Sequence, residues 1–342
     1  MSLIEALMPN LPFAQVGFVE ATWIMIVKSI LIFLVVFSLV PMILIGERKL
    51  LGRFQGRYGP NRVGPYGLMQ PLADVIKLIT KEVFRPKGAV PFLYLIGPAL
   101  VVLSAILTLS LVPFGPVIGD TVGLYGIDVS IGILLVFAFG SFAFYGLLIG
   151  GWASGSKYSF LGAMRAAAQL ISYEIALGLS LMGTVLLAGS LSLTEIVEAQ
   201  DKMWFIVPQI VAFVIFLISA FAETNRPPFD LTEADAELVQ GYMTEYGGMR
   251  FGTFMLAEYM ELFVISALGV TFFFGGWLGP GPDWLGPLWM LLKTGLFVCL
   301  FIWARATLPR PRYDQLMSLG WKVLIPLATL NVLVTATLVV VL

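Results

Sequence analysis

The sequence predicts an all-α membrane protein with about eight transmembrane helices and one amphipathic helix on the cytoplasmic side. Of its 342 residues, 59% are hydrophobic and only 12% are charged, and the mean hydropathy is +0.94. Soluble domains are about one-quarter charged, so water is not the main solvent of this chain. Several apolar runs reach the ~20 residues that a helix needs to cross about 30 Å of hydrocarbon. Basic residues also collect in alternate loops between those runs.

Eight apolar runs predict the transmembrane helices. They cover residues 20–46, 91–112, 130–152, 166–189, 204–224, 251–277, 287–308 and 321–342. The loops after the first, third, fifth and seventh run, with their flanks, contain all but three of the 20 Lys and Arg residues; the exceptions are Lys28, Lys202 and Lys293. Basic loops stay on the cytoplasmic or matrix side, so both termini are expected on the periplasmic or intermembrane side. Residues 1–342 are expected to form a single membrane domain.

The longest predicted loop, residues 47–90, contains the amphipathic helix, which we expect over residues 67–83. Four polar residues of this segment are spaced by four, three and four positions, so they share one helical face. They are Gln70, Asp74, Lys77 and Lys81. Apolar side chains fill the opposite face, which favours a helix that lies on the membrane surface instead of crossing it.

The residue types that the chain lacks bear on redox and metal centres. Histidine is absent and Cys299 is the single cysteine. The chain by itself therefore lacks the usual ligands of haem, copper, zinc or an iron–sulfur cluster, and it cannot form a disulfide. We expect no metal and no redox centre here, so any electron has to arrive from another subunit. A net charge of −1 and a pI near 5.6 also argue against nucleic acid as a partner.

Ionisable residues inside the predicted spans need a reason, because a central charge costs ~2.5–3.5 kcal/mol on insertion scales. They are Glu174, Glu223, Glu258, Glu261 and Lys293. A carboxyl group removed from water favours its protonated form and can exchange that proton when a nearby charge changes, so the set is a candidate proton relay. The alternative is structural, since buried polar groups can simply hold helices together. Glu261 is the weakest member, because the sequence does not indicate which side of its helix is buried.

A second acidic group follows the fifth span, in a predicted acidic cytoplasmic loop, residues 223–250. Its acidic residues are Glu223, Asp230, Glu233, Asp235, Glu237 and Glu245. Such a loop is usually a solvated surface. Here apolar residues alternate with the acids, and Pro227 and Pro228 end the helix, so the loop is expected to fold back and pack against another element. Clustered carboxylates in a partly buried site titrate together and respond to a nearby charge change.

A series of motifs runs through the chain from the first span to the last. They include Glu47-Arg-Lys-Leu-Leu-Gly52, Arg57-Tyr-Gly-Pro-Asn61, Val63-Gly-Pro-Tyr-Gly67, Gln70-Pro-Leu-Ala-Asp74, Gly151-Trp-Ala-Ser154, Ile171-Ser-Tyr-Glu174, Ala222-Glu-Thr-Asn-Arg226, Pro228-Phe-Asp-Leu231, Ala257-Glu-Tyr259 and Arg310-Pro-Arg-Tyr-Asp-Gln-Leu-Met317. In sequence and order, this series resembles the NuoH-type membrane subunit of respiratory complex I, the proton-translocating NADH:quinone oxidoreductase. The departures are small: Asp235, Gly155 and Thr232 stand where the family commonly has Glu, Asn and Pro, and no titratable group is lost.

The resemblance implies a subunit that joins the hydrophilic arm of the complex to its proton-pumping arm, in a bacterial or mitochondrial inner membrane. Its neighbours would be lipid, the hydrophilic iron–sulfur and quinone-site subunits, and the pump subunits. The substrate would be a quinone, ubiquinone or menaquinone, and no haem, iron–sulfur cluster, flavin or metal would bind to this chain. With no catalytic residue in this chain alone, the enzyme would be the whole complex.

The motif positions also imply roles for individual residues. The lining of the quinone tunnel and the subunit contact would involve Glu47, Arg48, Arg57, Arg226, Phe229, Asp230, Arg305 and Arg310. The acidic path toward the membrane arm would involve Glu174, Glu223, Glu233, Asp235, Glu237, Glu245 and Glu258, and we add Lys293 to this path as the intramembrane cation.

Two other functions compete with this interpretation. A stand-alone proton-coupled transporter should contain two similar halves with broken helices at matching positions, and the sequence shows no such pair. The nearer alternative is the homologous anchor of an energy-converting hydrogenase or a related dehydrogenase, in which a quinone tunnel is not needed. Activity with hydrogen or formate, instead of NADH and quinone, would favour that alternative.

Overall fold

The computed structural model describes residues 22–118, 122–232 and 235–341, and it confirms an all-α membrane protein. Within these residues, seven helical segments are long and apolar enough to cross a membrane. They are α2 (Thr22–Phe54), α4 (Pro91–Leu111), α5 (Gly132–Ala153), α6 (Lys157–Ala188), α10 (Gly248–Phe273), α11 (Gly286–Thr307) and a last segment made of α12 (Tyr313–Leu319), the π-helical turn η5 (Gly320–Leu324) and α13 (Ile325–Val341). These segments correspond to seven of the eight predicted spans.

The remaining predicted span, residues 204–224, is helical only in its second part, α8 (Ile210–Glu223). Its 14 residues rise about 21 Å, less than the ~30 Å of a hydrocarbon core. The residues before α8 form turns that meet the end of α10, where the Ile206 amide donates to the Phe273 carbonyl (3.0 Å). Non-helical backbone at this place is tolerated because the protein itself satisfies its polar groups.

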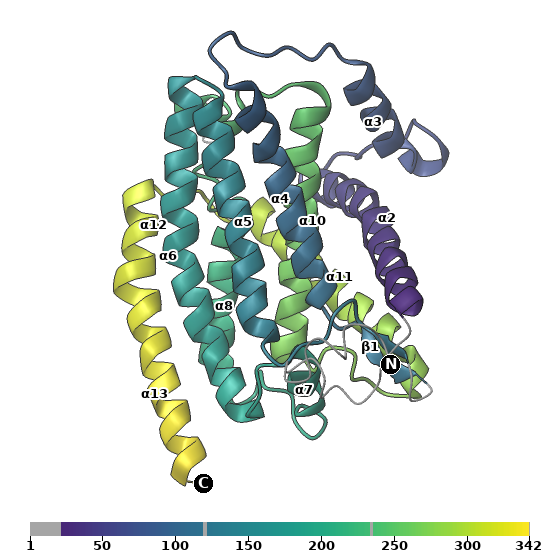
Figure 1. Cartoon of the computed structure of the whole chain (residues 1–342), viewed down its shortest axis with the longest axis vertical. Helices are drawn as coiled ribbons and strands as arrows, with labels where there is room; N and C mark the ends of the chain where they lie inside the picture. The colour runs from purple at the N-terminus through teal and green to yellow at the C-terminus, as the bar shows by residue number, and fades with distance from the viewer. Residues whose placement is uncertain (1–21, 119–121, 233–234, 342) are drawn as a thin grey trace, which may run out of the picture.

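The helices form a bundle with two outlying members. α4, α5 and α6 lie next to one another, α10 runs against α4, and α13 lies along α6 at one edge, while α2 lies at the other edge (Figure 1). The closest pair is α4 with α5, in which small residues face one another. A Cβ added to Gly97 would lie 2.6 Å from Gly150 Cα, so these two helices touch through their backbones.

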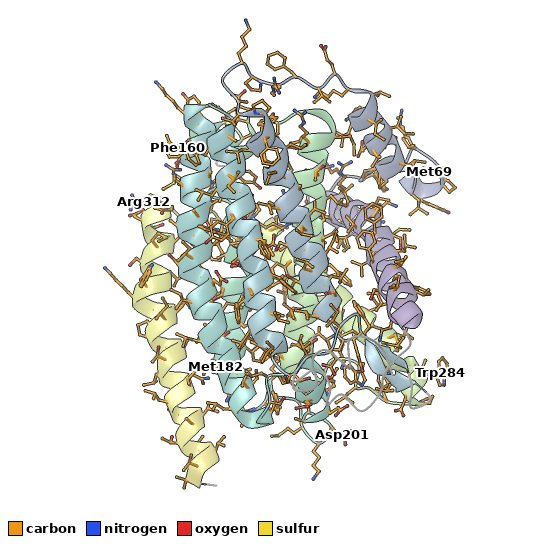
Figure 2. All side chains as sticks on the ribbon, viewed as in Figure 1. Met69, Phe160, Met182, Asp201, Trp284 and Arg312 are labelled. Atoms are coloured by element: carbon orange, nitrogen blue, oxygen red, sulfur yellow. The ribbon has the colours of Figure 1, made fainter. Side chains whose placement is uncertain are left out.

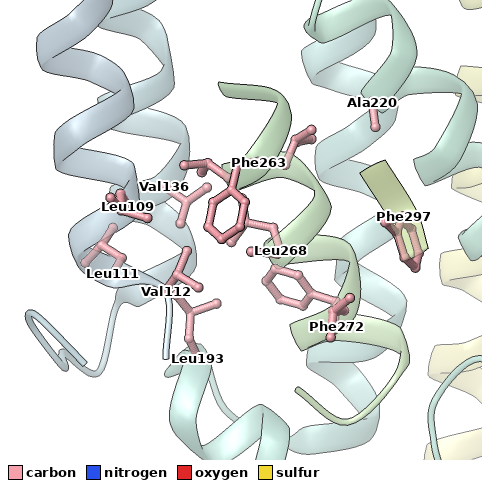
Figure 3. Close-up of a cluster of buried hydrophobic side chains, with 14 of the residues drawn as sticks. Leu109, Leu111, Val112, Val136, Leu193, Ala220, Phe263, Leu268, Phe272 and Phe297 are labelled. Atoms are coloured by element: carbon pink, nitrogen blue, oxygen red, sulfur yellow. The ribbon is translucent and has the colours of Figure 1, made fainter. Parts of the chain in front are cut away.

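α10 is the central helix of the bundle. In its most apolar window 83% of the residues are buried, against 17% in the corresponding windows of α2 and the last segment, so these two lie at the edges. Figure 3 shows Phe263 and Phe272 of α10 within a cluster of apolar side chains that also includes Val136 of α5 and Phe297 of α11. Packing of aromatic and branched side chains around α10 therefore fixes the bundle from which the polar site is built.

The first loop begins later than predicted. α2 continues past residue 46 to Phe54, because Glu47 is buried among basic partners and the residues after it remain helical, with Arg53 near the negative end of the helix dipole. The amphipathic helix expected over residues 67–83 is present as the shorter α3 (Gln70–Thr80), after a 3₁₀ turn, η2 (Pro65–Gly67).

Several short elements were not predicted from the sequence. They are the antiparallel strands β1 (Gly115–Ile118) and β2 (Val122–Leu124), α7 (Leu193–Glu198), α9 (Asp235–Leu238), η3 (Gly241–Met243) and η4 (Asp283–Leu285). All are shorter than the ten or more residues at which hydrophobic periodicity becomes informative.

The basic loops all lie at one end of the bundle. α2 ends at this upper end in Figure 1, and α3 lies beside its end. Figure 2 shows Met69, Phe160 and Arg312 toward the same end, and Asp201 and Trp284 toward the opposite end. The alternation of loops inferred from charge is therefore reproduced by the path of the helices.

Candidate functional site

Four separate elements bring a cluster of charged side chains together near the upper end of the bundle. We call it the ion cluster; its members are Glu47 from α2, Arg226 from the turn after α8, Glu258 from α10 and Arg305 from the end of α11. Arg226 Nη1 donates to Glu47 Oε2 (3.1 Å), and Arg226 Nε donates to Glu258 Oε1 (2.8 Å). Arg305 Nη1 donates to the other oxygen of Glu47. One guanidinium thus joins two carboxylates, and one carboxylate joins two guanidiniums.

The ion pairs of this cluster are buried, so water does not stabilise their charges. The side chains of Arg226 and Glu47 are only 4% and 2% exposed, so each charge depends on its partners instead of on water. The Arg226 guanidinium also lies over the ring of Tyr259, 4.2 Å from its centroid. Burial alone would lower the pKa of Arg226, but the carboxylates of Glu258 and Glu47 outweigh it and hold that pKa above its ordinary value. Arg226 is therefore a permanent cation.

A tight turn positions Arg226. α8 ends at Glu223, and Asn225 then adopts a left-handed conformation (φ 50°), which asparagine tolerates better than most residues. Gln169 of α6, which is fully buried, holds this turn from the other side. Its side-chain amide donates to the carbonyls of Ala222 (2.8 Å) and Phe229 (2.9 Å). The turn is thus fixed to α6 at two points, and Arg226 leaves it toward α2 and α10.

A cavity of about 50 Å³ lies deeper in the bundle, and three carboxylates line it. They are Glu174 of α6, Glu223 of α8 and Glu261 of α10, and the other polar lining residues are Ser104 and Thr108 of α4. A water needs about 10–15 Å³ by this measure, so the carboxylate cavity has room for a few waters. Within the described residues, Glu223 Oε2 is buried without a hydrogen-bond partner. A buried oxygen of this kind normally binds water or carries a proton.

α10 connects the two sites. Glu258 of the ion cluster and Glu261 of the cavity are three residues apart, which places them one turn apart on one side of the helix, about 4.5 Å along its axis. Glu223 and Glu174 thus line one cavity together with Glu261, which was the weakest member of the predicted set. Glu258 lies one turn of α10 from Glu261, outside the cavity lining.

The other predicted tunnel residues lie outside the ion cluster. Arg48 Nη1 donates to Asp74 of α3 (2.8 Å) at the surface, and Arg57 is exposed. Phe229 stacks on Tyr173, with ring centroids 6.2 Å apart. Two residues remain: Asp230 is half-buried in the loop after α8, and Arg310 is exposed near Glu237.

Two of the acidic-loop residues lie away from the cavity. Glu237 is exposed and accepts a hydrogen bond from Arg165 Nη1 of α6 (2.5 Å), and this bond and the charge of Arg165 lower the pKa of Glu237. Glu245 is half-buried, and its backbone carbonyl accepts from the Tyr94 hydroxyl (2.5 Å). Glu233 lies outside the described residues, and Asp235 is described only as the first residue of α9.

Lys293 lies far from the glutamates with which it was grouped. Its ammonium binds backbone carbonyls of the turn that follows α10, the first of them that of Phe274. Phe274 lies thirteen positions after Glu261 along α10 and its cap, which corresponds to about 20 Å.

Four residues of the two sites had no predicted role: Tyr259, Gln169, Ser104 and Thr108. Tyr259 ends the motif Ala257-Glu-Tyr259, and Gln169 lies two residues before the motif Ile171-Ser-Tyr-Glu174. The motifs therefore indicated these positions, although not their contacts. Ser104 and Thr108 are spaced by four within an apolar run, and this spacing on one helical face was the available signal.

Comparisons with known proteins agree on one family. Residues 27–336 match the family model described as NADH dehydrogenase. The first of the numbered H subunits of NADH-quinone oxidoreductase from Geobacter metallireducens is 55% identical over 312 residues, which cover 90% of this chain and 94% of that protein. The second H subunit from Geobacter sulfurreducens is 54% identical over the same shares, and the H subunit from Protochlamydia amoebophila is 51% identical over 85% of this chain and 90% of that protein.

Proposed function

The chain belongs to the family of H subunits of NADH-quinone oxidoreductase, and we propose that it couples quinone reduction to proton transfer in respiratory complex I through the line from the ion cluster to the carboxylate cavity. The observation that carries this proposal is that line itself: ionisable side chains from several helices lie in sequence through an otherwise apolar bundle. The names of the relatives favour NADH and quinone over the hydrogenase-anchor alternative.

The ion cluster is suited to sense charge on a bound quinone. Arg226 divides its hydrogen bonds between Glu47 and Glu258, and its Nη2 is buried without a partner within the described part of the chain. Negative charge that develops nearby competes with Glu258 for the guanidinium. A Glu258 carboxylate that loses part of this stabilisation in a low-dielectric site takes up a proton more readily.

The carboxylate cavity is suited to pass that proton on. Glu258 and Glu261 share one side of α10, and water in the cavity would join Glu261 to Glu223 and Glu174. Since neighbouring carboxylates resist ionising together, protonation at one end of the line changes proton affinity at the next member. Glu174 of α6 would be the exit toward the membrane arm. Lys293 is not a member of this path.

The same function implies partners and a location. As a subunit of complex I, the chain would sit in an energy-transducing membrane, with its basic loops on the cytoplasmic or matrix side. The hydrophilic subunits that carry the iron–sulfur clusters and complete the quinone site would contact those loops, and the proton-pumping subunits would follow α6. Ubiquinone and menaquinone both fit this proposal.

The proposal is tested by replacing Glu223 with Gln in the assembled complex. Gln keeps nearly the same shape and can hydrogen-bond, but it cannot titrate, so quinone reductase rate and proton uptake by sealed vesicles should both fall about tenfold or more. NADH oxidation by a hydrophilic artificial acceptor should stay near the wild-type rate, because that reaction needs no proton path.

A control variant and a check of assembly make this test decisive. Glu237→Gln, at an exposed carboxylate outside the line, should leave both rates nearly unchanged. Native gels must first show that each variant assembles. Wild-type quinone reduction and proton uptake in an assembled Glu223→Gln complex would make Glu223 structural and remove the cavity from the path.

A further inference from the structure

Lys293 binds a ring of backbone carbonyls at the lower end of α10. Its Nζ donates one hydrogen bond to each of three carbonyls, those of Phe274 (2.7 Å), Gly276 (3.0 Å) and Leu278 (2.5 Å). A lysine ammonium has three N–H donors, so all of them are used. The ring of Trp204 completes the site, with its centroid 4.7 Å from Nζ.

The turn that carries these carbonyls is built to hold a cation. Gly275 and Gly276 have positive φ (67° and 48°), which lets the chain reverse within a few residues after α10. A side chain at Gly275 would meet the Trp204 indole at 3.0 Å, so the glycine also makes room for the aromatic wall. Carbonyls at the end of a helix carry partial negative charge, which favours a positive group there.

A second buried side chain holds the same turn from its amide side. Gln200 Oε1 accepts from the Gly275 amide (2.9 Å), and its Nε2 donates to the Thr271 carbonyl (2.8 Å) in the last turn of α10. Gln200 is fully buried. Gln200 thus links the Gly275 amide to the segment after α7 by a hydrogen bond. Lys293 links the carbonyls of the same turn to α11.

We propose that Lys293 is a tethered cation that fixes the end of α10, and thereby positions Glu258 and Glu261 on that helix, instead of carrying protons. The positioning of the two glutamates rests on the proposed function; the cation site stands on its own contacts. A proton carrier must break a bond to release its proton and must have a neighbour to receive it. Lys293 has three carbonyl acceptors around it, which cannot take a proton, and the nearest glutamate of the line is about 20 Å along α10.

Arginine and methionine at this position separate a fixed cation from a proton carrier. Arg stays charged at every working pH and still donates hydrogen bonds, whereas Met keeps the length of the side chain without the charge. In the assembled complex, Lys293→Arg should keep quinone reduction and proton uptake within about twofold of wild type, and Lys293→Met should lower both about tenfold. The pH profile of quinone reduction should shift in Lys293→Met and stay in place in Lys293→Arg, because only the former lets the α10 glutamates move.

A structural measurement tests the cation site without relying on activity. Backbone hydrogen exchange of residues 270–279, followed by mass spectrometry, should be about tenfold faster in Lys293→Met and within about twofold of wild type in Lys293→Arg. Lys28→Met is the matched control. Lys28, on α2, also binds a backbone carbonyl at the lower end of the bundle, but that of Gly123 in β2 (3.1 Å), so its loss should not change exchange in this segment.

Chemical rescue covers the case in which the substituted complexes do not assemble. Lys293→Ala leaves the carbonyl ring without its cation, and ethylammonium supplied during growth and extraction should restore assembly, whereas tetramethylammonium, which has the charge but no N–H donors, should not. An assembled Lys293→Arg complex that has lost proton uptake would overturn the proposal, as would unchanged exchange in Lys293→Met or equal rescue by both amines. A wild-type complex inactive with NADH and quinone would instead contradict the proposed function and leave the exchange result standing.

Discussion

The ion cluster depends on one residue more than on the others, because Arg226 bonds to two carboxylates at once. Replacing Arg226 with Ala leaves Glu47 with Arg305 alone and Glu258 without its cation in a buried site. Removing one partner from a buried ion pair costs about 3–5 kcal/mol. We therefore expect Arg226→Ala to lower the thermal stability of the complex and to reduce quinone reductase activity at least tenfold, measured in membranes against an artificial hydrophilic acceptor as reference.

A surface ion pair of the same chain provides the control for Arg226. Arg48 donates to Asp74 at 2.8 Å, but the two side chains are 44% and 24% exposed, and pairs of this kind contribute about 0–1 kcal/mol. Arg48→Ala should therefore leave thermal stability nearly unchanged. Equal losses of thermal stability in Arg226→Ala and Arg48→Ala would contradict this prediction. They would mean that burial does not determine how much each arginine contributes to stability.

At the scale of residues, the sequence identified the charged groups better than it identified their partners. Glu47, Arg226, Glu258 and Arg305 were all candidates, yet three of them were assigned to the tunnel and Glu258 to the proton path. Their contacts span up to 258 positions in sequence, so local patterns could not reveal them. Lys293 was grouped with the glutamates only because it lies inside a predicted span. Which groups a buried cation binds depends instead on the side of its helix and on the turn that lies beside it.

At the scale of elements, the contact between α4 and α5 depends on glycine. A methyl group at Gly97 would lie 2.6 Å from Gly150 Cα and 3.1 Å from the Gly146 carbonyl, so Gly97→Ala forces the two helices apart. Overpacking of this kind costs about 1–3 kcal/mol. We expect a lower yield of assembled complex and a fall of several degrees in the temperature at which it dissociates on native gels.

Gly295 of α11 is the matched control for this substitution, because nothing lies within 4 Å of a Cβ added there. Alanine is the better helix former, so Gly295→Ala should be neutral or slightly stabilising, by up to about 1 kcal/mol. If Gly97→Ala proves as harmless as Gly295→Ala, the backbone contact between α4 and α5 is not important for assembly.

Hydropathy predicted the long elements well and the short ones poorly. The seven long spans follow from the length of apolar runs, because the bilayer requires about 20 apolar residues in a helix. The prediction for α8 was only partly right. Its apolar run is long enough for a span, but the helix begins only at Ile210, because the preceding turn hydrogen-bonds to the end of α10. α2 shows the opposite error. It continues beyond its apolar run because the partners of Glu47, Arg226 and Arg305, which lie far along the chain from it, keep that polar residue of the helix buried.

The whole molecule has a charge asymmetry that predicts its orientation in the membrane. The loops that contain nearly all Lys and Arg lie at one end of the bundle, together with the ion cluster, and the carbonyl ring around Lys293 lies at the other end. Positive loops remain on the cytoplasmic or matrix side, so the quinone-linked chemistry would take place on the side where NADH is oxidised. Neither the asymmetry nor this conclusion depends on the details of packing.

Single cysteines introduced at opposite ends test this orientation. Lys157, exposed at the start of α6, is a better site than the neighbouring Gly155, whose φ is +72° and where an added Cβ would lie 2.6 Å from the Gly88 carbonyl oxygen. In a Cys299→Ser background, an impermeant maleimide added to inside-out vesicles should label Lys157→Cys and not Asp201→Cys, and intact cells or right-side-out vesicles should give the reverse. Labelling of both positions from one side would contradict the single crossing that α6 makes between residues 157 and 201. Labelling from opposite sides but in the inverted sense would keep the fold and move the ion cluster to the periplasmic face, where NADH is not available to it.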